Sequence, residues 1–290
     1  MEAVTRIQSV RERVAEWRAA GQRVALVQTM GCLHKGHLAL IAEARHRTPR
    51  VVVSVFVNPL QFGPQEDFGR YPRTIEHDKE LAGEAGADLV FAPTTFEIFP
   101  TGFERSTRVD VPELSRILEG QFRPSHFEGV ATIAAKFLQI VQPDVAVLGE
   151  KDYQHLVIVR RLVADLCMPV EIAAVPVIRD HDGLAYGARN RFLAPRERNL
   201  APRLYEALRN ARRRLADGER DFAALQEAGL RELERAGFAP DYFSIRQSGD
   251  LLPPRYETRD VVVLAAARLG STRLVDCVQV SLPPRARTAG

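Results

Sequence analysis

Hydrophobic and polar positions follow two alternating periods over residues 1–178. Short, β-branched apolar runs predict buried strands at 24–27, 51–57, 88–92, 145–148 and 170–178, the last interrupted by Pro176. Between them, apolar residues at helical spacing predict helices at 3–20, 75–85, 130–141 and 153–166, with another that follows His37 and ends near Thr48. Strands that alternate with helices are typical of a parallel sheet with right-handed crossovers. The fold class predicted for 1–178 is therefore α/β, a Rossmann-like domain.

The pattern changes after Arg179. A helical stretch rich in Arg and Ala follows Pro195, and three short strands are predicted at 242–246, 261–267 and 272–280. This mixture predicts a second, smaller α+β domain over 179–283, and residues 284–290 are expected to form a disordered tail. The irregular stretch 93–130 is long enough to be functional or part of an interface.

The stretch between the first strand and its helix carries the clearest chemistry. Gly31 and Gly36 permit a tight turn and a close approach of ligand to backbone, and the helix start offers N–H groups to an anion. His34 and His37 at this place suit a phosphate chain that gains charge during a reaction. Two other interpretations stay open: Cys32 could join both histidines as a metal ligand, or the histidines could be ordinary loop residues. No second Cys/His cluster in the sequence would complete a four-ligand metal site.

Composition narrows the class of protein. The 290 residues are 46% hydrophobic and 27% charged, as in a soluble globular protein, and the net charge of +3 is too small to indicate nucleic-acid binding. The three cysteines are widely separated, which favours reduced thiols and a cytoplasmic location. Residues 1–23 do not resemble a signal peptide, and no apolar run approaches the roughly 18 residues of a membrane span, so no membrane partner is expected.

The histidine motif has companions along nearly the whole chain. His34-Lys35-Gly36-His37 resembles the His-x-Gly-His signature of the nucleotidyltransferase superfamily, which includes class I aminoacyl-tRNA synthetases. The companion motifs are Thr29-Met30-Gly31, Phe56-Val57-Asn58-Pro59-Leu60-Gln61-Phe62, Tyr71-Pro72-Arg73-Thr74, Gly149-Glu150-Lys151-Asp152-Tyr153-Gln154, Asp182-Gly183-Leu184-Ala185 with Arg189-Asn190-Arg191, and Ala265-Ala266-Ala267-Arg268-Leu269-Gly270. In this order the motifs resemble the pantothenate synthetase (pantoate–β-alanine ligase) family over about residues 3–282.

The resemblance implies a two-step reaction. ATP and pantoate would form an acyl adenylate with release of pyrophosphate, and β-alanine would then displace AMP to give the amide. Such chemistry depends on charge neutralisation and positioning. The resemblance further implies ATP as co-substrate, Mg²⁺ bridging its phosphates, and a homodimer whose second domain closes as a lid over the phosphates.

The resemblance also assigns roles to residues. The catalytic residues would be His34, His37, Lys151 and Arg189. ATP would in addition contact Met30, Gly31, Gly36, Gly149, Asp152, Ile178, Tyr186, Gly187 and Ala188. The acid and amine substrates would contact Gln28, Met30, Asn58, Gln61, Tyr71, Arg123, Val130, Ile133, Ala134 and His155. Asp78 would be a water-mediated Mg²⁺ ligand.

Departures from the family pattern cluster around the acid pocket and the second phosphate motif. Gly187-Ala188 stands where the family usually has two serines, and His155 where it has a glutamine. Gln28, Ala134 and Leu148 also differ from the usual residues. Three alternatives therefore stay open: a related ligase acting on another acid or amine, a nucleotidyltransferase, and a non-catalytic nucleotide-binding relative.

Overall fold

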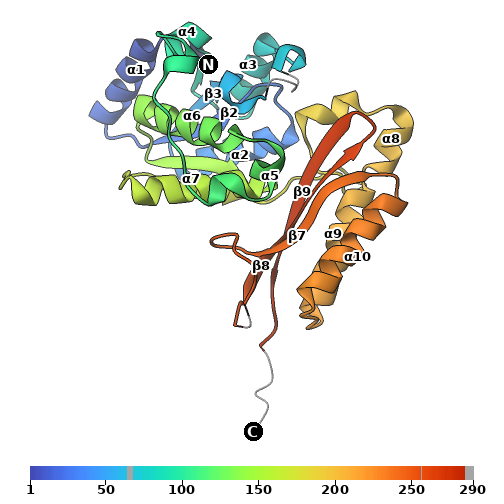
Figure 1. Ribbon diagram of the computed structural model, residues 1–290. Helices are drawn as coiled ribbons and strands as arrows, with labels where there is room; N and C mark the ends of the chain where they lie inside the picture. The colour runs from blue at the N-terminus through green and yellow to red at the C-terminus, as the bar shows by residue number, and fades with distance from the viewer. Residues whose placement is uncertain (64–67, 256, 285–290) are drawn as a thin grey trace. The chain divides into compact units, whose positions relative to one another are not determined.

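The computed structural model describes residues 1–63, 68–255 and 257–284 (Figure 1). The chain divides into two compact units. The first unit is Met1–Glu150 with Ile158–Pro176, and the second is Lys151–Val157 with Val177–Gly290. The chain passes into the second unit after Pro176, close to the boundary predicted after residue 178, but the earlier segment Lys151–Val157 also belongs to the second unit.

A six-stranded parallel sheet forms the centre of the first unit, in the order β1-β4-β3-β2-β5-β6. Its strands are Glu2–Val4 (β1), Val24–Thr29 (β2), Arg50–Val55 (β3), Leu89–Phe91 (β4), Val145–Gly149 (β5) and Glu171–Val175 (β6). The central strands are β-branched and buried on both faces, as the apolar runs indicated. The predicted α/β Rossmann-like class is confirmed.

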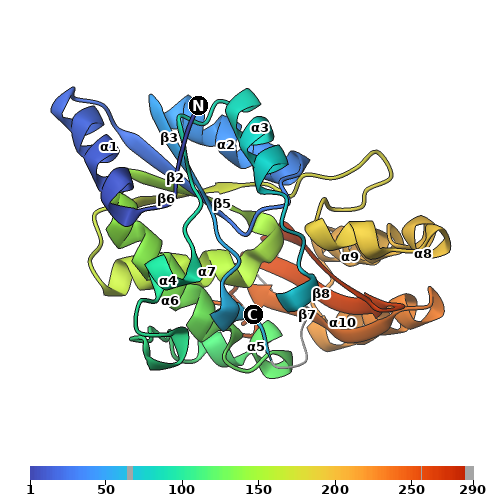
Figure 2. The same cartoon turned by 90° about the horizontal axis from the view of Figure 1, so that it is seen from above.

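Helices flank this sheet on both faces. They are Ile7–Ala19 (α1), Lys35–Arg47 (α2), Ile75–Glu84 (α3), Thr95–Ile98 (α4), Glu119–Phe122 (α5), His126–Val141 (α6) and Tyr153–Asp165 (α7). Helices α2 and α3 lie on one face, and α6 lies on the other, where it contacts α1 (Figure 2). Helix α6 is apolar around most of its circumference, and most of its side chains are buried. Its Phe137 packs against Phe56 and Phe91, with ring centroids 6.0 and 5.7 Å apart.

Three element predictions were wrong in detail. The helix expected at 3–20 begins at Ile7, because Glu2–Val4 pairs with Leu89–Phe91 as an edge strand. The stretch 93–130, expected to be irregular, contains α4, α5 and the first turns of α6. The long helical stretch after Pro195 is divided into Pro195–Leu200 (α8), Arg203–Ala216 (α9) and Phe222–Arg235 (α10).

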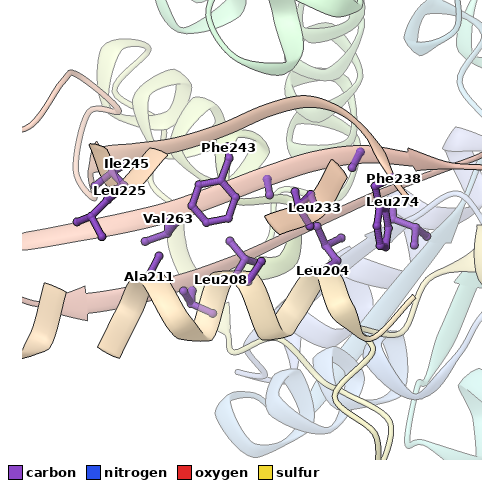
Figure 3. Packing of buried hydrophobic residues seen from close by; sticks show 14 of the residues in the cluster. Leu204, Leu208, Ala211, Leu225, Leu233, Phe238, Phe243, Ile245, Val263 and Leu274 are labelled. Carbon is purple, nitrogen blue, oxygen red and sulfur yellow. The ribbon is translucent and has the colours of Figure 1, made fainter. Parts of the chain in front are cut away.

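The second unit is built on a three-stranded antiparallel sheet in the order β7-β8-β9. Its strands are Ala239–Gln247 (β7), Asp260–Leu269 (β8) and Thr272–Ser281 (β9). Apolar side chains of α9 and α10 pack against the sheet; Figure 3 shows Leu204 and Leu208 of α9 beside Leu233 of α10 and Phe243 of β7. The predicted tail falls almost entirely outside the described residues. Among the described residues, no helix combines the length and the apolar character that crossing a bilayer requires.

Candidate active site

The two histidines of the motif lie at the start of α2. His34 is the N-cap residue, in an extended conformation (φ −145°, ψ 174°), and its Nδ1 accepts the N–H of Gly36 at 3.2 Å. This hydrogen bond requires an unprotonated Nδ1, so the neutral ring of His34 carries its proton on Nε2. The rings of His34 and His37 stack with centroids 4.0 Å apart. The pair therefore has a fixed orientation at the positive end of a helix dipole.

A turn with two left-handed residues connects β2 to this helix. Gly31 has φ +79° and Cys32 has φ +53°. The buried carboxylate of Asp78 on α3 accepts the N–H groups of Cys32 at 3.0 Å and Leu33 at 2.7 Å. A Cβ at Gly31 would lie 2.9 Å from Oδ2 of Asp78 and 3.0 Å from the side chain of Val55. Glycine is therefore required at position 31 by both its backbone conformation and its surroundings.

The predicted acid-binding residue Gln61 ends the short 3₁₀ turn Pro59–Gln61 (η1), which follows β3. The main-chain carbonyl of Gln61 accepts from Nη2 of Arg123 at 3.1 Å and lies 2.8 Å from Nδ1 of His126. Asn58 Nδ2 donates to the carbonyl of Gly129 at 3.0 Å, and Asn58 Oδ1 accepts the N–H of Leu60. Polar groups of Asn58 and Arg123, two predicted substrate contacts, thus hold the backbone that carries Gln61.

Other predicted acid-binding residues form a buried surface in the same unit. Val130, Ile133 and Ala134 are at most 2% exposed on α6, and Tyr71 is buried with its ring 5.8 Å from that of Phe62. Val130, Ile133 and Ala134 supply apolar contacts at this surface.

The second unit contains the other predicted phosphate-binding residues. Gly187 precedes the 3₁₀ turn Ala188–Phe192 (η6), which contains Arg189. A Cβ at Gly187 would lie 3.6 Å from Nζ of Lys151, so the structure brings this lysine and the 187–189 segment together. The backbone of Gly187 is extended (φ −164°), so its conformation does not itself require glycine.

Desolvation lowers the pKa of His155 below its ordinary value, and the charge of Asp152 opposes this shift.

A hairpin that includes Ile178 and Tyr186 leads into this segment. Tyr186 N–H donates to the carbonyl of Ile178 at 3.0 Å. Arg179 forms a bidentate pair with the buried carboxylate of Asp276 at 2.6 and 2.9 Å. Arg198 donates to both Asp180 and Asp182. The pKa of Asp180 is lowered mainly by its hydrogen bonds with His181 and to a smaller extent by its hydrogen bond with Arg198. The pKa of Asp182 is lowered mainly by its hydrogen bond with Arg198.

Three charged residues that form these ion pairs are not identifiable from the sequence. Arg179, Arg198 and Asp276 match no motif, and Arg179 and Asp276 are 97 positions apart, so only the folded chain reveals their partnership. The metal interpretation of Cys32 with the two histidines gains no support, because within the described ranges no three or more His, Cys, Asp or Glu side chains are grouped so as to hold a metal ion.

Comparison with known proteins identifies the family. The family model described as "Pantoate-beta-alanine ligase" matches residues 2–279. The chain belongs to the pantoate–β-alanine ligase family. Curated relatives in this family include pantothenate synthetases from Nitrosococcus oceani, 50% identical over 97% of this chain and 99% of the relative, and from Pseudomonas fluorescens Pf0-1, 49% identical over 97% of this chain and 99% of the relative.

Solved structures agree with this assignment. Pantothenate synthetase from Thermus thermophilus is 46% identical, with a TM-score of 0.87 over 96% of this chain and 99% of that chain. A pantoate–β-alanine ligase from Francisella tularensis, solved with "Beta-gamma ATP and Beta-alanine", is 29% identical with a TM-score of 0.80 over 96% and 97% of the two chains.

As a pantoate–β-alanine ligase, the chain condenses pantoate with β-alanine at the expense of ATP. The reaction passes through pantoyl adenylate and releases pyrophosphate and AMP. Identity near 50% along the whole chain supports pantoate as the acid despite His155 and the other departures, and it does not favour a nucleotidyltransferase or a non-catalytic relative.

Proposed function

We propose that His34, His37, Lys151 and Arg189 carry the adenylation step of this reaction. The observation that supports this best is the stacked imidazole pair at the start of α2, held by the Gly36 N–H. When the pantoate carboxylate attacks the α-phosphorus, negative charge builds on the phosphate oxygens and on the departing pyrophosphate. Donors fixed in advance stabilise that charge without reorganising during the reaction. Lysine and arginine add full positive charges, and arginine offers a bidentate fork to phosphate.

The remaining ATP contacts are also proposed from the family resemblance. Met30, Gly31 and Gly36 would present the backbone of the β2–α2 connection to the nucleotide, and Gly149 would allow close approach at the end of β5. From the second unit, ATP would contact Asp152, Ile178, Tyr186, Gly187 and Ala188. Backbone N–H groups at 187–188 would replace the hydroxyl donors that two serines would supply.

Pantoate would be held by the segment around Gln61 and by α6. Gln61 would hydrogen-bond the acid through its amide, while Tyr71, Val130, Ile133 and Ala134 would enclose its apolar part. Gln28, Met30 and His155 would complete the substrate contacts. Asn58 and Arg123 would also support the backbone of Gln61, because Asn58 donates to the Gly129 carbonyl and Arg123 donates to the Gln61 carbonyl.

Three further features belong to this proposal. Mg²⁺ would arrive with ATP, held by phosphate oxygens and water. Asp78 is 1% exposed and its carboxylate faces two backbone N–H groups and the Thr74 hydroxyl, so we assign it to the turn at Gly31–Leu33 in place of a metal-bound water. The active protein would be a homodimer, as the resemblance implies, and sedimentation would show a species of twice the 32.4 kDa chain mass.

A cytoplasmic location is favoured by Cys32, Cys167 and Cys277, which form no disulfide and all lie in the described ranges.

The decisive test is His37→Ala, assayed by pantoate-dependent exchange of pyrophosphate into ATP. Loss of a preorganised donor at the reacting phosphate is expected to slow exchange at least about 100-fold. His46→Ala is the matched control, because it removes an exposed histidine from the last turn of the same helix. Thermal unfolding of both variants should match the parent. Unchanged exchange in His37→Ala would remove this residue from the mechanism.

A further inference from the structure

Asp78 is buried on α3 and points its carboxylate at the turn that precedes α2. The side chain is 1% exposed. Oδ2 accepts the N–H of Cys32 at 3.0 Å, and Oδ1 accepts the N–H of Leu33 at 2.7 Å. The hydroxyl of Thr74, one helical turn earlier, lies 3.2 Å from each oxygen. Three donors therefore hold one carboxylate, and two of them are successive backbone N–H groups.

The turn that Asp78 contacts has an unfavourable backbone conformation. Gly31 and Cys32 both have positive φ, and a non-glycine residue adopts this region only when its surroundings compensate. Consecutive N–H groups in such a turn form a concave site for an anion. Here the anion is supplied by the chain itself. The close approach of Oδ2 to position 31, where a Cβ would lie 2.9 Å away, shows how tightly the carboxylate fits.

We propose that Asp78 is a positioning residue for adenylation: its carboxylate fixes the turn at Gly31–Leu33 and so sets the place and orientation of His34 and His37. The inference rests on the proposed role of the two histidines. His34 follows the two held amides directly, and its ring must accept from Gly36 and stack on His37 at the same time. A loosened turn would leave both rings present but poorly directed, which lowers the rate more than the affinity for ATP.

Asp78→Asn tests this assignment. Asparagine keeps the size of the side chain but replaces one acceptor oxygen by an NH₂ group, which would face a backbone N–H. The expected results are at least a tenfold fall in kcat for pantoate-dependent pyrophosphate exchange, a KM for ATP changed less than threefold, and faster deuterium uptake confined to residues 30–37. The Mg²⁺ concentration for half-maximal rate should be unchanged. Glu80→Gln is the matched control, since it removes a carboxylate that is 74% exposed on the same helix.

A second variant covers the case in which Asp78→Asn does not fold. Thr74→Val removes one donor to the carboxylate and leaves both backbone N–H bonds, so a smaller fall in kcat is expected, with uptake at 30–37 still raised. A higher Mg²⁺ requirement with normal uptake at 30–37 would overturn the inference and make Asp78 a metal-associated residue. Faster uptake with unchanged exchange would overturn it too, by showing that the turn does not control the reaction. The proposed role of His37 is tested separately by His37→Ala.

Discussion

His34 combines a structural role with its proposed chemical one. Helix N-caps are usually Ser, Thr, Asp or Asn, whose short side chains reach a backbone N–H one turn ahead. Here an imidazole takes this role, and Nδ1 accepts the N–H of Gly36. Because Nδ1 is held by the Gly36 N–H, the start of the helix also sets the direction of Nε2. The cap thus fixes the tautomer and direction of His34, as a second histidine or a carboxylate does in many active sites.

His155 should make stability depend on pH. Its folded-state pKa lies below the ordinary 6.5, chiefly because burial disfavours the imidazolium. The unfolded chain therefore binds the proton first as the pH falls, and folding stability is lost below about pH 6.5. His155→Gln removes this titration. We therefore expect the parent to lose stability relative to His155→Gln as the pH falls from 7.5 to 5.5. Denaturant unfolding of both proteins at the two pH values measures this difference in the free energy of unfolding.

The control for this measurement is His46→Gln, which removes an exposed histidine. A difference between His155→Gln and the parent that is the same at both pH values would contradict the burial of a neutral imidazole. Comparing pantoate KM for the same variant at pH 7.5 would separate the stability effect from any role in substrate contact.

Residue types alone reveal part of this site, and the family resemblance assigns the rest. The glycines and histidines of 31–37 are identifiable because each type has few physical uses at the start of a helix. The family resemblance, and not the residue type, assigns Asp78 to Mg²⁺ through water. The sequence does not show that the N–H groups of Cys32 and Leu33 converge on this carboxylate. The resemblance likewise assigns Asn58 a substrate contact, and the structure adds that its amide donates to the carbonyl of Gly129.

At the scale of elements, the packing of α6 against η1 controls the position of Gln61. Gly129, in the first turn of α6, lies so close to η1 that a Cβ would be 2.2 Å from the carbonyl oxygen of Leu60 and 3.0 Å from the nitrogen of Gln61. Only a hydrogen atom fits between these backbones. The same glycine accepts the Asn58 amide, so the two elements are joined by both packing and hydrogen bonding.

Gly129→Ala is expected to displace η1 and raise the KM for pantoate at least tenfold. The methyl group must push against backbone rather than a flexible side chain, so overpacking should also destabilise the protein by about 1–3 kcal/mol. Steady-state kinetics with varied pantoate and thermal unfolding would measure both effects.

Gly83→Ala is the control for Gly129→Ala, because a Cβ at this helical glycine of α3 would make only ordinary contacts with Met1, the nearest at 3.5 Å. It should leave kinetics unchanged and stabilise the protein by up to ~1 kcal/mol. An unchanged pantoate KM in Gly129→Ala would show that the position of η1 does not matter to the acid site.

Element boundaries are predictable where a period is long enough to count. Helices α3 and α7 have clear patterns: the spacing predicts 75–85 and 153–166, and the helices are Ile75–Glu84 and Tyr153–Asp165. Strand β1 has three residues, too few for any period, and its strand state depends on pairing with β4, which the chain reaches only at Leu89. The helical stretch after Pro195 keeps its spacing through two breaks, at Pro202 and at Gly218 with φ +98°, because the separate helices cover the same sheet.

At the scale of the molecule, family-wide motifs in a fixed order identify the reaction without any knowledge of geometry. Local physics predicts the Rossmann-like class from strand and helix periods. What neither can predict is the pairing of distant charges, such as Arg179 with Asp276 in the second unit. Such pairs depend on how segments far apart in the sequence come together in the fold, which the local sequence pattern does not specify.

The two units contain separate hydrophobic cores, and this predicts local effects of core mutations. The cluster around Leu208 is formed by residues between Leu184 and Leu282, all in the second unit. Leu208 is fully buried between α9 and the sheet (Figure 3). Leu208→Ala leaves a cavity and should lower the stability of this unit by about 2–5 kcal/mol. Deuterium uptake should rise in α9, α10 and β7–β9 and stay unchanged in β2, β3 and β5.

Leu26→Ala is the reciprocal variant, because Leu26 is 1% exposed at the centre of the first sheet. It should raise uptake in β2, β3 and β5 and leave β7–β9 protected. Uptake that rose throughout the described chain in both variants would show that the two cores unfold as one cooperative unit. If each variant raises deuterium uptake only in its own unit, the two units are independently stable. The histidine turn could then be altered without loosening the Gly187–Arg189 segment, and the reverse would also hold.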